Sequence, residues 1–401
     1  MRGSWQPVVG CLLALPILLG LAAAPAAAAE PATTTLTKEQ AEDRSNFIGQ
    51  VRKARLGDAE AQWYVGSTYV KLGDPTHALP VLSSAAAAGH PRAATLAGWL
   101  HEEGRGTEKN LEEAKRWYRI AAERGEAEAM AALGRLLLQG KGTDTREAAR
   151  KLFQQAAQLE NPDGQYYLGW LLTEHAGGPH DDAQAYAWFL KAARQGHVGA
   201  QLAVATHLLT ARGVTENRKE AGEWLMRAAK TQDPVAHYLL GRLREGTGAT
   251  EHDRARSSFR IAAAAGHREA QFALATLLAK SAAETDKKEA VEWFATAAEG
   301  GHLAAANRLG ELYWKGEGVL PQLDKARALF QRAAVAGEVN AMYNFAGMLS
   351  DGLGGPRDTD KALDWYARAA DEGHEGASAV VGRLLNSSIK TSSLELKGFW
   401  Q

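Results

Sequence analysis

The feature that most constrains this chain is a pair of adjacent alanines that occurs nine times in 401 residues, at spacings of 34 to 36 residues. In seven copies a glycine stands three residues after the pair, as at Ala85-Ala86 and Gly89. The other two copies keep the alanines but carry Glu160 and Gln232 in place of the glycine. A fixed period of this length indicates one supersecondary unit stacked many times, where the chain length alone would suggest two or three ordinary domains.

Each repeat is predicted to be a hairpin of two antiparallel helices. Seven residues before every alanine pair stands another alanine, and this spacing places all three on one helical face that a neighbouring helix can approach closely. The preceding helix begins near an alanine or glycine, and the residue five positions later is always small. These small residues are Gly66, Gly98, Gly134, Gly169, Ala205, Gly241, Ala275, Gly310 and Ala346. Because glycine inside a helix costs about 1 kcal/mol relative to alanine, its recurrence predicts close backbone contact with the partner helix.

The repeats resemble a known family. Residues 305–318 read Ala-Ala-Asn-Arg-Leu-Gly-Glu-Leu-Tyr-Trp-Lys-Gly-Glu-Gly, and Asp324-Lys325-Ala326 and Arg332-Ala333-Ala334 follow. These segments are similar to the Sel-one-like repeat family, a relative of the tetratricopeptide repeats. The resemblance implies an all-α fold, a right-handed α/α superhelix (solenoid) of about nine helix-turn-helix repeats of roughly 36 residues that serves as an adaptor or scaffold. It implies no catalytic residue.

The N-terminus is typical of an export signal. Arg2 is followed by an apolar run from Val8 to Leu21 and by four alanines ahead of Glu30, so residues 1–29 are predicted to be a cleaved signal peptide. The alternative is a retained membrane anchor, which the short run and Pro16 disfavour. The mature chain is therefore expected in the periplasm without a stable membrane span. It would also lack cysteine, since Cys11 is the only one.

The flanks of the repeat array are predicted to be caps. Residues 30–60 form a linker and an N-terminal capping helix, which opens at the capping box Thr37-Lys38-Glu39-Gln40 and turns Phe47, Ile48, Val51 and Ala54 inward. The nine repeats occupy residues 61–376, and residues 377–401 form a C-terminal half-repeat cap and tail.

Three segments imitate catalytic or binding motifs without meeting their requirements. Gly140-Lys141-Gly142-Thr143 resembles the end of a phosphate-binding loop, but no hydroxyl follows the lysine directly. Ser387-Ser388-Ile389-Lys390 has the Ser-x-x-Lys pattern without its companion motifs. Glu174, His175, His180 and Asp181 share one loop and have side chains that could bind a metal, but their spacing within a loop does not indicate a metal site. The prediction is a protein that is not an enzyme and holds no cofactor or metal.

A stripe on the first helices is the candidate binding surface. Six residues into these helices most side chains are polar, which indicates exposure, but Trp99 and Trp170 interrupt the column. Positions two and six share the stripe, which in tetratricopeptide-like solenoids lines the concave groove, and aromatic residues beside arginines are typical of binding hot spots. The candidate residues are Trp99, Arg135, Tyr166, Trp170, Tyr238 and Arg242. The alternative is that these rings only fill gaps between neighbouring first helices.

Composition limits the class of partner. With 45% hydrophobic residues, 23% charged residues and a net charge of -1, nothing draws the whole chain toward nucleic acid or an anionic membrane. The predicted function is a non-enzymatic periplasmic scaffold or adaptor that binds a protein partner through the concave face. The alternative is recognition of an envelope polysaccharide or peptidoglycan, because tryptophan rings suit sugar faces.

Overall fold

The computed structural model describes residues 38–140, 143–173, 181–245 and 248–383, and every regular element in these ranges is an α-helix. The chain divides into two compact units, Met1–His197 and Val198–Gln401. Several predicted features lie outside the described residues: the signal segment 1–29, Cys11, Lys141 and Gly142, the loop 174–180, and the tail from residue 384 with its Ser-x-x-Lys segment.

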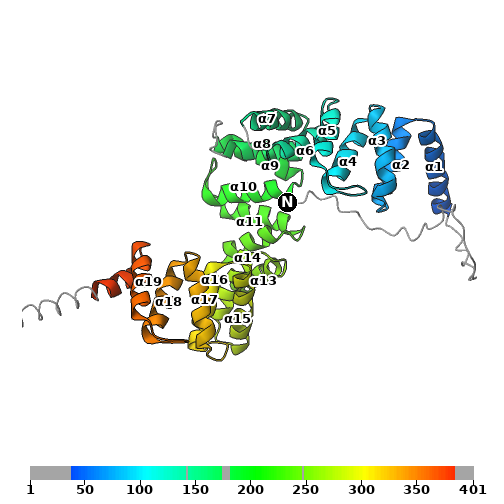
Figure 1. Cartoon of the computed structure of the whole chain (residues 1–401). Helices are drawn as coiled ribbons and strands as arrows, with labels where there is room; N and C mark the ends of the chain where they lie inside the picture. Colours follow the sequence, from blue (N-terminus) through cyan, green and yellow to red (C-terminus); the bar gives the residue numbers. More distant parts are fainter. Residues whose placement is uncertain (1–37, 141–142, 174–180, 246–247, 384–401) are drawn as a thin grey trace, which may run out of the picture. The chain divides into compact units, whose positions relative to one another are not determined.

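Unit 1 is a capping helix followed by four hairpins (Figure 1). Its helices are α1 (Lys38–Arg55), α2 (Ala59–Lys71), α3 (Pro75–Ala87), α4 (Pro91–Glu103), α5 (Leu111–Ala122), α6 (Ala127–Leu137), α7 (Thr143–Gln158), α8 (Pro162–Thr173) and α9 (Asp182–Arg194). The even-numbered helix of each pair is the first helix of a repeat and the odd-numbered helix is the second.

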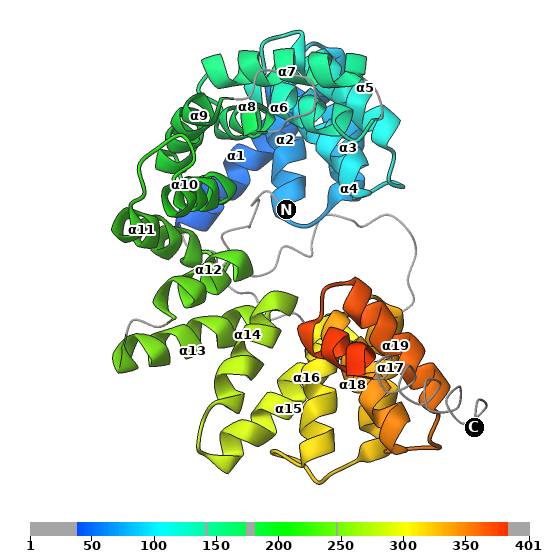
Figure 2. The same cartoon turned by 90° about the vertical axis from the view of Figure 1, so that its left-hand side faces the viewer.

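Unit 2 consists of five hairpins that pack side by side (Figure 2). Its helices are α10 (Val198–Thr210), α11 (Arg218–Ala229), α12 (Pro234–Arg244), α13 (Ala249–Ala264), α14 (Arg268–Ala279), α15 (Glu284–Glu299), α16 (Leu303–Lys315), α17 (Leu323–Val335), α18 (Val339–Asp351) and α19 (Thr359–Asp371). A further helical segment over residues 375–383 begins where a tenth first helix was expected. The all-α helical solenoid predicted from the repeat is confirmed.

The alanines form the core of each hairpin. The alanine seven residues before each pair is between 0% and 3% exposed in all nine repeats. The expected close approach at the small residues is also present, but the group that approaches is a side chain. A Cβ built at Gly241 would lie 2.4 Å from Cε1 of Phe259, and one at Gly134 would lie 2.7 Å from Cε1 of Phe153. The glycines are therefore required because a ring of the second helix lies against the backbone of the first.

The end of each second helix needs a left-handed residue. The seven glycines that stand three residues after an alanine pair have φ between +84° and +97°. Glu160 and Gln232 adopt φ of +59° in the two copies that lack this glycine. In eight repeats the next residue closes the turn by donating its N–H to the carbonyl of the first alanine of the pair, as from His90 to Ala85 at 3.0 Å. The repeat thus keeps its geometry where its consensus residue is missing.

Helix α1 packs against α2 and covers the first repeat. Phe47, Val51 and Ala54 contribute to the small cluster beneath it, as predicted. Ile48 was expected to face inward as well, but it is exposed, because its position on the helix turns it away from α2. No helix in the described ranges combines the length and the apolar character that crossing a membrane requires.

Candidate functional site

The first helices form the inner layer of each unit. Helix α2 contacts α4, α6 contacts α8, and in unit 2 α16 contacts α18, whereas the second helices mainly contact the first helices on either side. Helices that approach each other across repeats lie on the tighter side of a curved stack. The stripe residues of unit 1 lie on such first helices: Trp99 on α4, Arg135 on α6, and Tyr166 and Trp170 on α8.

Two tryptophans of the stripe lie in unit 1 and are half-buried. Trp99 packs on the core cluster of repeats one to three, and Trp170 packs on the cluster around Phe153. Each also has an arginine over its ring: Arg105 lies 5.1 Å from the ring centroid of Trp99 and Arg146 lies 5.9 Å from that of Trp170. The rings thus take part in packing and remain partly exposed, so packing and binding are compatible at these positions.

Arg135 is held by a buried carboxylate that the sequence analysis missed. Its Nη2 donates to Oε1 and Oε2 of Glu102 at 2.6 and 2.8 Å, and the Tyr118 hydroxyl donates to Oε2 at 2.9 Å. The Glu102 side chain is 7% exposed, whereas that of Arg135 is 36% exposed. The network fixes a guanidinium at the surface of the inner layer by means of a partner one repeat earlier.

Electrostatics are consistent with a fixed charge at Arg135. Burial raises the pKa of Tyr118 far above its usual range, and the nearby charge of Glu102 raises it further, so this hydroxyl stays a donor. Burial opposes the charge of Arg135, but the hydrogen bonds to Glu102 and the negative charge of Glu102 together outweigh burial and raise the pKa of Arg135. One available signal was that Glu102 is acidic at a helix position where most repeats carry apolar or small residues.

The two tyrosines of the stripe each stack on a histidine ring. Tyr166 is 9% exposed, and its ring stacks on His197 at 4.5 Å between centroids, which leaves little surface for a partner. Tyr238 stacks on His267 at 4.7 Å, and its hydroxyl accepts from Nη1 of Arg242 at 3.2 Å. Arg242 also pairs with Glu245 at 2.9 Å and remains exposed.

The aromatic–histidine stacks join two positions of the repeat that are about 30 residues apart in the sequence. In five repeats an aromatic residue stands two positions after the alanine or glycine near the start of the first helix, and a histidine stands four positions after the alanine pair. The two rings stack with centroids 4.3 to 5.4 Å apart. The pairs are Trp63 with His90, Tyr166 with His197, Tyr238 with His267, Phe272 with His302, and Tyr343 with His374. In the other four repeats neither residue is present: the pairs are Thr95 with Glu126, Ala131 with Asn161, Leu202 with Asp233, and Asn307 with Glu338. This covariation between the two positions is visible in the sequence alone.

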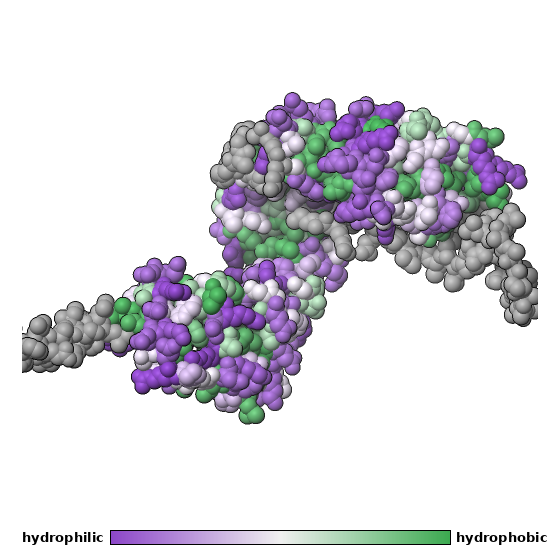
Figure 3. All heavy atoms as spheres, viewed as in Figure 1, coloured by the Kyte–Doolittle hydropathy of each residue, from purple (hydrophilic) through white to green (hydrophobic). Residues whose placement is uncertain are grey.

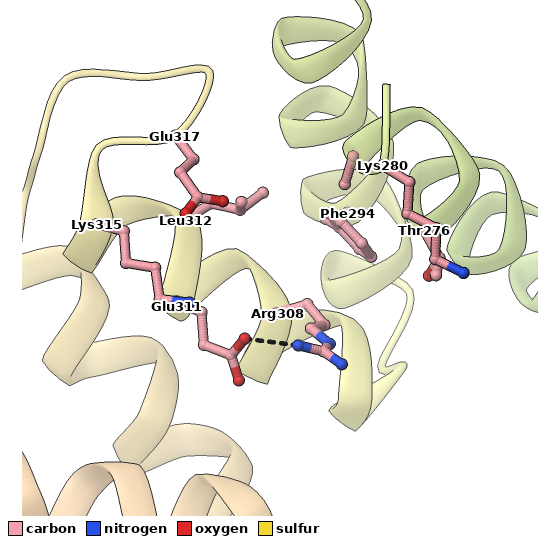
Figure 4. A pocket seen from close by; sticks show the side chains of 9 residues that line it. Thr276, Lys280, Phe294, Arg308, Glu311, Leu312, Lys315 and Glu317 are labelled. Atoms are coloured by element: carbon pink, nitrogen blue, oxygen red, sulfur yellow. Dashed lines mark hydrogen bonds and ion pairs between the residues drawn. The ribbon is translucent and has the colours of Figure 1, made fainter. Parts of the chain in front are cut away.

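Unit 2 has a shallow hollow between α14 and α16, with a volume of about 210 Å³ (Figure 4). Arg308 and Glu311 form an ion pair at 2.8 Å along its edge, and Lys280 and Lys315 flank it at the ends of the two helices. Cations are favourable at helix C-termini, which accounts for both lysines. Small-molecule sites usually occupy about 300 to 1,000 Å³, so this hollow does not indicate one.

The rest of the described surface gives no stronger candidate. On the face in Figure 3, hydrophobic residues form small patches that are interrupted by hydrophilic ones. Within the described ranges, no three His, Cys, Asp or Glu side chains lie close enough together to hold a metal ion. Most of the loop that carries Glu174, His175 and His180 is outside those ranges.

Curated relatives are regulators by name. The chain is 31% identical over 179 residues to the "Exopolysaccharide production negative regulator" of Rhizobium meliloti, a match that covers 41% of this chain and 66% of the relative. It is 28% identical over 258 residues to "Chitin synthase regulatory factor 3" of Schizosaccharomyces pombe, covering 61% of this chain and 28% of the relative. The matches thus span between about a quarter and two thirds of these relatives' own length.

Solved structures with similar chains include c5321, a protective antigen of uropathogenic Escherichia coli with an SLR fold. It is 23% identical, with a TM-score of 0.48 and coverage of 87% of this chain and 92% of that one. A Sel1 repeat protein from Oxalobacter formigenes is 26% identical, with a TM-score of 0.40 and coverage of 86% and 92%.

The family model for the Sel1 repeat matches eight consecutive segments. They are residues 91–126, 127–161, 162–197, 198–230, 234–267, 268–302, 303–337 and 339–374. Each segment contains one of the hairpins described above, from α4–α5 to α18–α19. This protein belongs to the Sel1 repeat family, whose members mediate protein–protein interaction.

Proposed function

We propose that this protein is a non-enzymatic scaffold that binds a protein partner through the inner layer of unit 1. One observation carries the proposal: Trp99, Arg135 and Trp170 occupy the same position on the consecutive first helices α4, α6 and α8, and Glu102 holds the arginine in place. Tryptophan and arginine dominate binding hot spots, and a side chain that is already ordered loses less entropy on binding. Tyr166 supports this surface in unit 1. In unit 2, Tyr238 supports Arg242, the exposed arginine at the corresponding position.

The regulator names of the relatives suggest the kind of partner. Exopolysaccharide production and chitin synthesis are both polymerisations of sugars, and the names describe regulation and not catalysis. We therefore place the partner among the proteins that make or export an envelope polysaccharide. The export signal predicted at residues 1–29 supports a periplasmic location for this encounter.

Site-specific photo-crosslinking in the native host tests the proposal. A benzophenone side chain is introduced at position 99 or 170 of the inner layer, or at the exposed control positions 119 and 154 on the second helices α5 and α7. We expect an adduct with an exported protein from positions 99 and 170 and none from the controls. Arg135→Ala in the same chains should reduce the adduct about tenfold, as loss of one hot-spot residue does.

Two outcomes would contradict this function. Equal crosslinking from the inner and control positions would remove the inner layer as the binding surface. An adduct with a cytoplasmic protein would remove the periplasmic location.

Direct recognition of a glycan is the second candidate, because the partly exposed rings of Trp99 and Trp170 could stack on sugar rings. Glycan-array binding by the purified chain that disappears in Trp99→Ala and Trp170→Ala would favour it. A protein adduct without glycan binding would favour the scaffold.

A further inference from the structure

Four of the five histidines that follow the second helices share one capping geometry. The Nδ1 atom accepts the backbone N–H three residues later: His90 from Ala93 at 3.2 Å, and His267 from Ala270, His302 from Ala305 and His374 from Ala377 at 3.1 Å. These rings therefore cap the N-termini of the first helices. Since Nδ1 is the acceptor, the neutral ring carries its proton on Nε2.

The joints differ in what Nε2 meets. Nε2 lies 3.0 Å from Glu60 in His90, 3.1 Å from Asp163 in His197 and 3.2 Å from Glu269 in His302. Each of these carboxylates belongs to the repeat before the histidine. It stands directly before the alanine or glycine near which the first helix of that repeat begins. At His267 that residue is Val235 and at His374 it is Asn340, and no carboxylate among the described residues hydrogen-bonds to Nε2 of His267.

Few charges surround His267. The turn before α12 contributes Asp233 and α14 contributes Glu269, but neither bonds to the ring. Helix α12 contributes the ring of Tyr238, whose hydroxyl meets Arg242, and α13 ends in alanines at 262–265. Arg268 points away to the carbonyl of Gly300 at 2.7 Å. Burial lowers the pKa of His267, and the two acids only partly oppose it.

We propose that the joint between the sixth and seventh repeats is an acid-labile hinge, in which protonation of His267 releases the N-terminus of α14. A protonated ring cannot accept the N–H of Ala270, which then keeps only the carbonyl of His267 at 3.0 Å as its acceptor. The protonated ring also places a positive charge where the helix dipole is positive. At His90, His197 and His302 a carboxylate offsets that charge, so those joints hold under the same conditions.

The sign of the effect follows from the direction of the pKa shift. The pKa of His267 is lower in the folded chain than in the unfolded chain, so the unfolded chain binds more protons between the two values. The stabilisation is complete above the ordinary imidazole pKa of about 6.5 and is lost as the pH falls through the folded value.

Hydrogen exchange of the full chain, read by mass spectrometry, tests the hinge. Protection is compared between about pH 7.5 and about pH 5, on either side of the ordinary imidazole pKa, after correction for intrinsic exchange rates. We expect the N-terminal turn of α14 to lose about fivefold in protection, the size expected for one lost cap. The N-terminal turn of α16, which is capped by His302 beside Glu269, is the internal control and should change little.

Two variants make the test specific. His267→Asn keeps a cap, as Asn161 does for Gly164 at 2.8 Å, but cannot titrate, so α14 should lose its pH dependence. Val235→Glu copies the Glu269 arrangement at a position that is 38% exposed, and should reduce the pH dependence of α14 to that of α16. Equal acid loss at α14 and α16 in the unaltered chain, or unchanged acid loss in His267→Asn, would overturn the proposal. No response to Val235→Glu would overturn the role given to the absent carboxylate.

Discussion

At the scale of single residues, the buried carboxylate of Glu102 organises the candidate surface. It accepts hydrogen bonds from Arg135 of the next repeat and from Tyr118 of its own repeat, so three helices meet at one side chain. Removing it leaves a guanidinium and a hydroxyl without their acceptor. Such losses are large because the partners are already desolvated.

Glu102→Ala should therefore lower the free energy of unfolding of unit 1 by about 2 to 3 kcal/mol, below the range for fully buried pairs because Arg135 is partly exposed. Urea denaturation followed by circular dichroism measures the change. The matched control is Glu103→Ala, the exposed neighbour, which should stay within about 0.5 kcal/mol. Equal effects at the two positions would contradict the role of the network.

At the scale of elements, the fit of most hairpins depends on a ring of the second helix that lies against a small residue of the first, whereas the first repeat places Leu82 against Gly66. Phe153, Phe189, Phe259 and Phe330 all lie within 3 Å of the place where a side chain would begin on the facing glycine. Interiors are packed densely enough that one added methyl group must move a neighbour. The aromatic column therefore explains the glycine column.

Gly241→Ala should destabilise unit 2 by about 1 to 3 kcal/mol, because its Cβ would lie 2.4 Å from the Phe259 ring. Thermal and urea unfolding measure this. Gly49→Ala in α1 has nothing within 4 Å and should stabilise by about 0.5 to 1 kcal/mol through helix propensity alone. Stabilisation by both substitutions would show that the ring contact does not matter.

At the scale of the whole molecule, the main helix contacts join elements that are neighbours in sequence. Energetic coupling in such an array passes from one repeat to the next, and its strength is set by each interface. The two units can therefore respond differently to the same condition.

Gly241→Ala should accordingly speed hydrogen exchange in α12 and α13 first and in their neighbours α11 and α14 less, and leave α2 to α5 unchanged. Exchange mass spectrometry at neutral pH resolves these helices. A uniform increase across both units would contradict nearest-neighbour coupling.

The sequence by itself determined the helix hairpins, their number and their family, because helical periodicity and the alanine and glycine positions are local signals repeated nine times. It also identified Trp99 and Trp170 as exceptions to a polar column that includes Arg135. Helical periodicity cannot show which residues meet between repeats, so the stripe residues appeared in the sequence without their partners.

Only the tertiary structure decided those partners. Glu102 meets Arg135 across 33 positions, and Tyr166 lies beneath His197 across 31. Ile48 turned outward for the same reason, since the face that α1 buries depends on where α2 lies. The physical cause is that contacts between repeats depend on how one hairpin is rotated on the next, and this rotation is set by packing that no single repeat contains.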